Sequence, residues 1–326
     1  MPNHYQTAFF EALRTAGADL QVRYYQAVRP ARLAMGWNSF SNLPDGEQYL
    51  SKNTRPTDTM PDWQERIHIL PGTTSAGAIR DVLRACCRKR VPWVHWSEPS
   101  HAGWRWAVGY PAKWRYARMV NHYALGAFGI GEWALRDFCR WGVRREKLAL
   151  LPYSSQMPQE VSGADQPCAL FRQDRFGIVY AGGLCHRKGI DVLLKAFASA
   201  TRSYSKSVLM LVGNDQSYGA YRAMADTLGI SARVLFRGPV PPQELGGILH
   251  CADLFCLPSR HDGWGVVLNE AASRGLALVA SDRCGAAHHL IVPGENGVRV
   301  RAGDVRSLAN ALQTYVQNPI LAHIHG

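Results

Sequence analysis

No stretch of the sequence approaches the roughly 18 apolar residues that a membrane-spanning helix needs. The first ten residues, "MPNHYQTAFF", contain no basic region followed by an apolar one, so no secretory signal is expected either. We therefore expect a globular protein of the cytoplasm. Its 326 residues, 47% of them hydrophobic and 19% charged, suffice for two domains that each bury a core.

Patterns of metal binding are missing as well. The eight cysteines form no CxxC pair, and no Cys and His residues have the spacing of a zinc site. We expect buried, reduced thiols and no metal. The chain also shows no internal repeat and no low-complexity segment.

The sequence does carry an uneven positive charge. The net charge is +12, and residues 1–153 contain 21 Lys and Arg against 12 Asp and Glu, whereas the remainder contains 16 against 13. Residues 80–118 alone hold 9 basic and 2 acidic residues, together with Trp104, Trp106 and Trp114. Such a patch implies an anionic partner. An aromatic core with solvated arginines and a surface that contacts anionic lipid are about equally favoured; no recognition motif for nucleic acid accompanies the charge.

Strands and helices alternate in the second half of the chain. From about residue 173, apolar runs such as "FGIVYAG" and "LALVAS" are separated by helix-length segments, which indicates βαβ units and a parallel sheet. The first half shows a similar but weaker pattern. We predict an α/β protein with one Rossmann-like domain at 1–153, a linker rich in Pro, Ser and Gln at 154–172, and a second Rossmann-like domain at 173–326.

Two acidic residues frame a loop in the second half. In "RHDGWGVVLNEAASRG", Asp262 follows a predicted strand and Glu270 lies eight residues later in a predicted helix. The residues whose N–H groups precede that helix are Gly263, Trp264, Gly265 and Val266. Free N–H groups at a helix start suit an anion such as a diphosphate, and Glu270 is placed to accept hydrogen bonds from two hydroxyls of a ribose. Taken alone, the spacing favours a purely structural interpretation over a binding site by roughly two to one. In that interpretation Asp262 is an ordinary N-cap and Glu270 is a solvated helix residue.

A second loop, "YAGGLCHRKGIDVLL", changes these odds. Gly182 and Gly183 form a predicted turn, and Arg187 and Lys188 lie at a predicted helix start. Cations there oppose the helix dipole, so a bound polyphosphate is needed to make them favourable. The loop fits neither the P-loop nor GxGxxG, which argues against an ATPase or a nicotinamide dehydrogenase.

Residues 173–317 resemble the nucleotide-sugar-binding domain of retaining glycosyltransferases of family 4, which have the two-domain GT-B fold. The segments that carry the resemblance are "YAGGLCHRKGIDVLLKAF", "VLFRGPVPPQELGGILHCADLFCLPS", "DGWGVVLNE" and "GENGVRV". The resemblance implies two doubly wound domains facing a cleft, shortened at both termini. It also implies an enzyme of hexosyltransferase type that moves a sugar from a nucleoside diphosphate sugar to a hydroxyl acceptor with retention of configuration. The family needs no metal or other cofactor.

The resemblance also assigns roles to single residues. Asp262 and Glu270 match the family's E-x7-E signature, with Asp in the first position. It implies that Asp262 is catalytic and lies near the transferred sugar, and that Glu270 holds the ribose. Lys188 then pairs with the diphosphate, and backbone near Arg237 borders the base. In the first half, His95 falls where the family often places a histidine beside the sugar.

The chain departs from the family pattern at three places. Gly183 stands where an arginine is usual, so one charge on the diphosphate must be met by Arg187 or remain unmet. His289 stands where an acid is common. Both ends are shorter than those of such domains.

Three functions therefore stay open. The first is sugar transfer to a glycan or lipid-linked glycan, the latter placing residues 80–118 against the cytoplasmic face of an anionic membrane. The second is a related GT-B enzyme, an epimerase or phosphorylase, against which the signature and the lack of a pyridoxal lysine motif count. The third is a catalytically weak or inactive binding protein, which Gly183 and the short ends favour.

Overall fold

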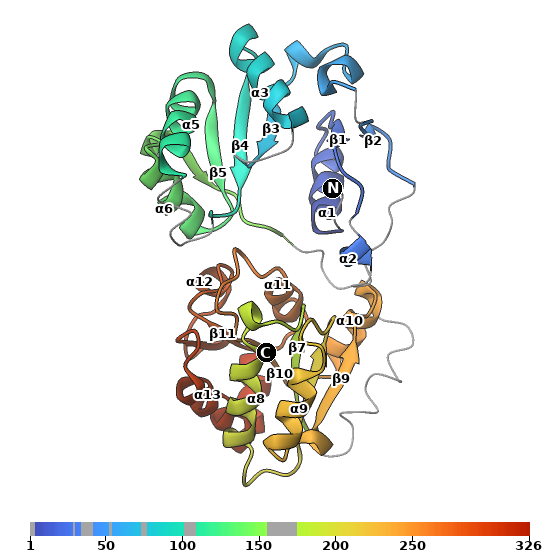
Figure 1. Ribbon diagram of the computed structural model, residues 1–326, viewed down its shortest axis with the longest axis vertical. Helices are drawn as coiled ribbons and strands as arrows, with labels where there is room; N and C mark the ends of the chain where they lie inside the picture. The colour runs from blue at the N-terminus through green and yellow to red at the C-terminus, as the bar shows by residue number, and fades with distance from the viewer. Residues whose placement is uncertain are drawn as a thin grey trace. The chain divides into compact units, whose positions relative to one another are not determined.

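The computed structural model describes residues 4–28, 30–33, 42–51, 54–72, 77–100, 109–154 and 175–326 (Figure 1). The chain divides into two compact units. Among the described residues, the first unit holds 4–28 and 42–153, and the second holds 154, 175–326 and helix α2 (Pro30–Leu33). The predicted linker lies outside the described residues except for Ser154.

The second unit is built on a six-stranded parallel sheet with the order β12-β11-β10-β7-β8-β9. Its strands are β7 (Phe176–Ala181), β8 (Ser207–Val212), β9 (Val234–Gly238), β10 (Leu254–Leu257), β11 (Ala277–Ser281) and β12 (Gly297–Val300). Every residue of β7, β8, β10 and β11 is buried. The sequences of these strands are nearly continuous apolar runs, as expected where helices cover both faces of a sheet.

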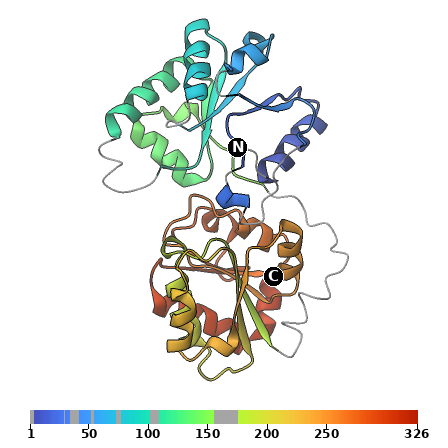
Figure 2. The same ribbon diagram turned by 45° about the vertical axis from the view of Figure 1, so that its right-hand side comes forward.

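Helices lie on both faces of this sheet (Figure 2). They are α8 (Ile190–Ala200), α9 (Ala220–Thr227), α10 (Pro242–His250), α11 (Val267–Ala272), α12 (Ala287–Leu290), α13 (Val305–Gln317) and α14 (Pro319–His325). The chain steps from β7 to β8 and β9 in one direction and from β10 to β11 and β12 in the other. Right-handed crossovers therefore place the connecting helices of the two halves on opposite faces. The direction reverses between β7 and β10, so the loops that follow these two strands lie side by side at one edge.

The first unit has a four-stranded parallel sheet with the order β3-β4-β5-β6 and a separate parallel pair, β1-β2. Its strands are β1 (Val22–Tyr24), β2 (Glu47–Tyr49), β3 (His68–Pro71), β4 (Trp93–Ser97), β5 (Gly126–Gly129) and β6 (Leu148–Leu150), and its longer helices are α1 (His4–Thr15), α3 (Gly77–Lys89), α5 (Tyr110–Tyr123) and α6 (Glu132–Trp141). The predicted α/β fold with two Rossmann-like, parallel-sheet units is confirmed. The sequence analysis did not predict α5, which begins with Pro111 in its first turn.

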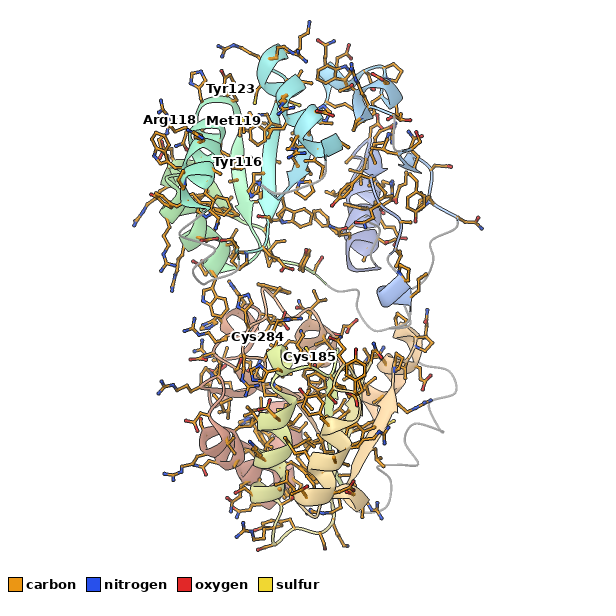
Figure 3. All side chains as sticks on the ribbon, in the orientation of Figure 1. Tyr116, Arg118, Met119, Tyr123, Cys185 and Cys284 are labelled. Carbon is orange, nitrogen blue, oxygen red and sulfur yellow. The ribbon has the colours of Figure 1, made fainter. Side chains whose placement is uncertain are left out.

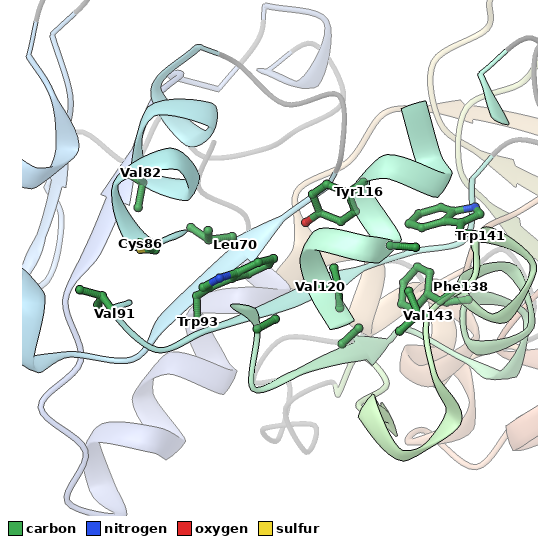
Figure 4. Packing of buried hydrophobic residues seen from close by; sticks show 14 residues of the cluster. Leu70, Val82, Cys86, Val91, Trp93, Tyr116, Val120, Phe138, Trp141 and Val143 are labelled. Atoms are coloured by element: carbon green, nitrogen blue, oxygen red, sulfur yellow. The ribbon is translucent and has the colours of Figure 1, made fainter. Parts of the chain in front are cut away.

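Aromatic residues fill the core of the first unit (Figure 4). Trp93 and Trp141 are 0% and 2% exposed, and they pack with Phe138 and Val120. For these tryptophans the core interpretation is therefore correct. Trp114 differs from them, since 44% of its surface is exposed; the predicted Trp104 and Trp106 contacts lie outside the described residues.

The prediction of buried, reduced cysteines holds for only part of the set. Cys86, Cys256 and Cys284 are buried free thiols. Cys139, by contrast, is exposed, and Cys251 is disulfide-bonded. Cys139 lies in α6, whose buried side chains include Phe138 and Trp141, and its own exposure could not be predicted from the residue type alone.

Candidate functional site

Two loops come together where β7 and β10 end. The first contains Gly182, with a φ of +145°, and Gly189, with a φ of +73°. A Cβ atom on Gly189 would lie 2.2 Å from the carbonyl oxygen of Pro258 in the second loop. Both the positive φ and this close approach require glycine at position 189, so the two backbones are held together at this point.

Arg260 connects the two loops through hydrogen bonds and an ion pair. Its guanidinium donates to both carboxylate oxygens of Asp191, at 2.6 and 2.7 Å, and to the carbonyl oxygen of His186 at 2.8 Å. Its backbone N–H donates to the carbonyl oxygen of Arg187 at 2.8 Å. A bidentate Arg–carboxylate pair fixes orientation as well as distance. The sequence analysis missed this pair, because 69 positions separate its members and nothing local signals their contact.

The residues predicted to bind the diphosphate lie directly beside this Arg260–Asp191 pair. Arg187 and Lys188 belong to a short 3-10 turn (His186–Lys188) that precedes α8, not to the helix itself. Arg187 donates to the carbonyl oxygen of His261 at 2.9 Å, and the Lys188 ammonium pairs with the Asp262 carboxylate. The structure thus brings two of the predicted residues, Lys188 and Asp262, into direct contact.

The loop of residues 263–266 is tightly packed. Gly265 has a φ of +89°, and a Cβ atom on it would lie 2.6 Å from the sulfur of Cys284, which Figure 3 labels. Gly285 in the facing loop is constrained as well, because a Cβ atom on it would lie 2.3 Å from the carbonyl oxygen of Gly263. The glycines here therefore also serve close packing between loops, in addition to the ligand approach that the sequence suggested.

Two findings refine the expectations about this loop. The Trp264 side chain is 2% exposed, donates from Nε1 to Asn269 at 2.9 Å and packs against the ring of His289, so it is a packing residue. The expected contact of its backbone N–H with a diphosphate stays a prediction. The helix that follows begins at Val267 and has only six residues. Its dipole is correspondingly small, which leaves Arg187 and Lys188 as the main positive charges.

Glu270 is the unusual member of this region. Its Oε2 atom is buried and has no hydrogen-bond partner among the described residues. Burial raises the pKa of the Glu270 carboxyl to about 7, although Arg274 acts in the opposite direction. A buried acceptor left unpaired costs about 1 to 3 kcal/mol, so the fold maintains an acceptor here at the expense of stability.

The space beside Gly183 is occupied by the side chain of Gln216, which was not predicted from the sequence. Tyr180 donates to the carbonyl oxygen of Gly183 at 3.0 Å. A Cβ atom on Gly183 would lie 2.9 Å from the amide nitrogen of Gln216, which comes from the loop after β8. Gln216 therefore occupies space that a longer side chain at position 183 would need.

Arg237 lies apart from these contacts. It belongs to β9, the edge strand, and its guanidinium pairs with Glu244 at the start of α10. Two strands, β7 and β8, separate β9 from β10. The expectation that backbone near Arg237 borders a base stays a prediction.

His95 is buried in the core of the first unit. Its side chain is 1% exposed, and both ring nitrogens have partners at 2.9 Å, Nε2 with the Ser97 hydroxyl and Nδ1 with the Tyr116 hydroxyl. Its ring also contacts Phe138 and Trp141. Burial lowers the pKa of His95 to about 4. These contacts favour a structural role for this imidazole, and the catalytic role that the resemblance implied stays a prediction.

The part of the chain that the structure describes contains no cluster of three or more His, Cys, Asp or Glu that could hold a metal ion. Within the same residues, no helix is long and apolar enough to cross a membrane.

The comparisons with known proteins agree with this architecture. Residues 165–325 match the family model "Glycosyl transferases group 1". The lipopolysaccharide core biosynthesis mannosyltransferase LpcC of Rhizobium leguminosarum bv. viciae is 34% identical over 152 residues, which cover 44% of this chain and 42% of that protein. The GDP-mannose-dependent alpha-(1-6)-phosphatidylinositol monomannoside mannosyltransferase of Mycolicibacterium smegmatis is 30% identical over 153 residues, 45% of this chain and 40% of its own. The matched part thus spans less than half the length of either relative.

A solved structure extends the likeness to the first unit. Anabaena Alr3699/HepE in complex with UDP has a TM-score of 0.70 at 18% identity, covering 86% of this chain and 79% of its own. Together, the two parallel-sheet units define a protein of the GT-B fold. Through its second unit, the chain resembles the glycosyl transferases group 1 family, whose model matches residues 165–325, just under half of the chain.

Proposed function

We propose that this protein transfers a sugar from a nucleoside diphosphate sugar to a hydroxyl of a glycan or lipid-linked glycan, with retention of configuration. The buried, unpartnered oxygen of Glu270 carries the proposal, because it provides a desolvated acceptor on the helix that follows the Asp262 loop. The two relatives are both named mannosyltransferases, one of them GDP-mannose-dependent, which supports a nucleotide-sugar donor.

The proposed chemistry relies on charge placed in advance. When the bond between the sugar and the diphosphate breaks, negative charge develops on the leaving diphosphate. Arg187 and Lys188 are held by the second loop where they can stabilise that charge, and fixed electrostatic stabilisation is commonly the largest catalytic contribution. The acceptor hydroxyl oxygen forms the new bond to the sugar carbon as the bond to the diphosphate breaks, and its proton passes to the departing diphosphate oxygen. We assign no protein nucleophile, no metal and no other cofactor.

Thermal-shift measurements with UDP-, GDP- and ADP-sugars test donor binding. A ligand at 100 times its Kd stabilises the folded state by about 2.7 kcal/mol, which is readily seen as a rise in Tm. No shift with any of the three donors, at concentrations up to several millimolar, would contradict the proposal. A shift without hydrolysis or transfer of a labelled sugar would instead identify a binding protein, the alternative that Gly183 favours.

A second proposal concerns the charged surface of the first unit. Trp114 and Tyr123 on α5 are 44% and 39% exposed, and the guanidiniums of Arg118 and Arg90 lie over their rings at 4.9 and 5.9 Å (Figure 3). Exposed aromatic rings beside basic side chains suit the interface of an anionic membrane. We therefore propose that the α3 and α5 surface contacts anionic lipid at the cytoplasmic face of a membrane when the acceptor is lipid-linked.

A further inference from the structure

The charge that a diphosphate needs from Lys188 is already engaged within the protein. The Lys188 ammonium pairs with the Asp262 carboxylate, and only 14% and 12% of the two side chains are exposed. Solvent and salt screen a pair of this kind far less than a surface pair. Any anion that binds Lys188 must therefore compete with Asp262.

The surrounding contacts keep that competitor in place. The Asp262 N–H donates to the carbonyl oxygen of Arg283 at 2.9 Å, and the Asp262 carbonyl oxygen accepts from Gly285 at 3.1 Å. The neighbouring Arg260 is fixed to Asp191. Because the backbone on both sides is held, the Asp262 carboxylate stays beside Lys188, whereas the ammonium sits on a flexible stem and can turn to another anion.

We propose that Asp262 makes the site discriminate between a nucleoside diphosphate sugar and the free nucleoside diphosphate. When a sugar nucleotide binds, sugar hydroxyls donate to Asp262 as Lys188 turns to the diphosphate, so both charges stay paired. When a free nucleoside diphosphate binds, Lys188 leaves the carboxylate without a partner, and an unpaired buried charge is costly. The product is thereby bound less tightly than the donor, which favours its release. This inference rests on the proposed function.

Calorimetric titration with UDP, GDP and ADP tests the competition directly. In Asp262→Asn, Lys188 has no competing carboxylate, and we expect the Kd of the preferred diphosphate to fall about tenfold, within the range of coupling between neighbouring charged residues. The Kd of the corresponding sugar nucleotide should not fall in parallel, because the variant also loses an acceptor for the sugar. Asp262→Glu keeps the charge and should stay within about threefold of the wild type; Asp262→Ser is the second neutral variant if Asp262→Asn does not fold.

The control is the same substitution in a Lys188→Met background. There we expect less than a twofold effect of Asp262→Asn, because the residue it competes for is gone. Equal tightening in both backgrounds would mean general repulsion between Asp262 and the ligand and would overturn the competition. Unchanged or weaker diphosphate binding by folded Asp262→Asn would overturn it as well. If the wild type binds none of the diphosphates or sugar nucleotides, the proposed function fails and the inference fails with it; if the wild type binds and only the variant result is contrary, the inference alone fails.

Discussion

His95 in the first unit and Glu270 in the second are both buried titratable groups, and burial shifts both toward their neutral forms. The pKa of His95 is lowered to about 4, and that of Glu270 is raised to about 7. They differ in their partners, since both nitrogens of His95 are hydrogen-bonded whereas Oε2 of Glu270 is not. A buried polar group with all its partners supports the fold, and a buried carboxylate without them calls for a further partner, such as a ligand or an ordered water. Burial alone does not separate the two.

The largest predicted effect is on stability, and it follows from the burial and the two hydrogen bonds of the His95 ring. His95→Ala removes a buried ring and leaves the Tyr116 hydroxyl without the imidazole that it contacts, so we expect it to lower the free energy of unfolding by about 3 to 5 kcal/mol. Nucleotide affinity of the folded fraction should not change. Chemical denaturation and calorimetry measure the two quantities. His122→Ala, an exposed histidine of the same unit, is the matched control and should cost no more than about 0.5 kcal/mol. A stable His95→Ala protein with lost nucleotide binding would reverse the comparison.

Glu270 predicts a dependence on pH with a definite sign. Its pKa in the folded protein, about 7, lies above the ordinary value of 4.5, so the folded state binds more protons than the unfolded state between these values. Stability should therefore fall as pH rises from 4.5 to 7. Glu270→Gln removes the cost of ionisation and should raise the free energy of unfolding at pH 8 by up to about 3 kcal/mol, since one pKa unit corresponds to about 1.4 kcal/mol.

Urea titrations of wild type and Glu270→Gln at pH 5 and pH 8 check this expectation. The exposed Glu295→Gln is the control, and it should leave the difference between the two pH values as it is in the wild type. If Glu270→Gln is no more stable than the wild type at pH 8, then the carboxylate has a partner after all and the contrast with His95 disappears.

The sequence predicted the second unit more fully than the first for a physical reason. Its strands β7, β8, β10 and β11 are buried at every residue and nearly all apolar, and its turns carry the glycines that their backbone conformations require, as at Gly182 and Gly265. In the first unit, α5 was missed because its many aromatic and basic residues were interpreted as a surface patch. The burial of His95 could not be predicted, because a histidine in a strand looks the same in sequence whether or not helices cover it.

Contacts between distant segments were beyond prediction from sequence. The turn containing Lys188 and the loop containing Asp262 were each identified from local pattern, but their direct pairing depends on β7 and β10 being neighbours. The ion pair between Arg260 and Asp191 also depends on β7 and β10 being neighbours. Such pairs become visible only when the strand order is known.

The predicted roles of Glu270 toward the ribose and of Lys188 toward the diphosphate can be tested by measuring nucleotide binding. Glu270→Ala should weaken nucleotide binding by about 1.5 to 3 kcal/mol, the range for hydrogen bonds to charged groups. Lys188→Ala should reduce the affinity for UDP or GDP more than that for uridine or guanosine, because its expected partner is the diphosphate charge. Calorimetry with each nucleoside and its diphosphate separates the two roles. Unchanged affinity in folded Glu270→Ala, or equal losses for nucleoside and diphosphate in Lys188→Ala, would remove the residue concerned from the site.

The smallest predicted effects concern the surfaces of the two units. If the first unit contacts anionic lipid, replacing Arg88, Lys89 or Arg90 singly with Gln should each weaken binding by about 1 kcal/mol, with steep salt dependence. Trp114→Ala should remove a part of the binding that salt does not affect, because an interfacial indole is held by its apolar ring. Cosedimentation with vesicles containing anionic lipid measures both effects. The matched control is Lys195→Gln or Arg202→Gln, exposed cations of the second unit, which should leave binding unchanged. If the wild type does not sediment with anionic vesicles at low salt, the basic surface is instead a solvated face or a site for an acidic soluble acceptor. Contact with a membrane then no longer distinguishes the first unit from the second.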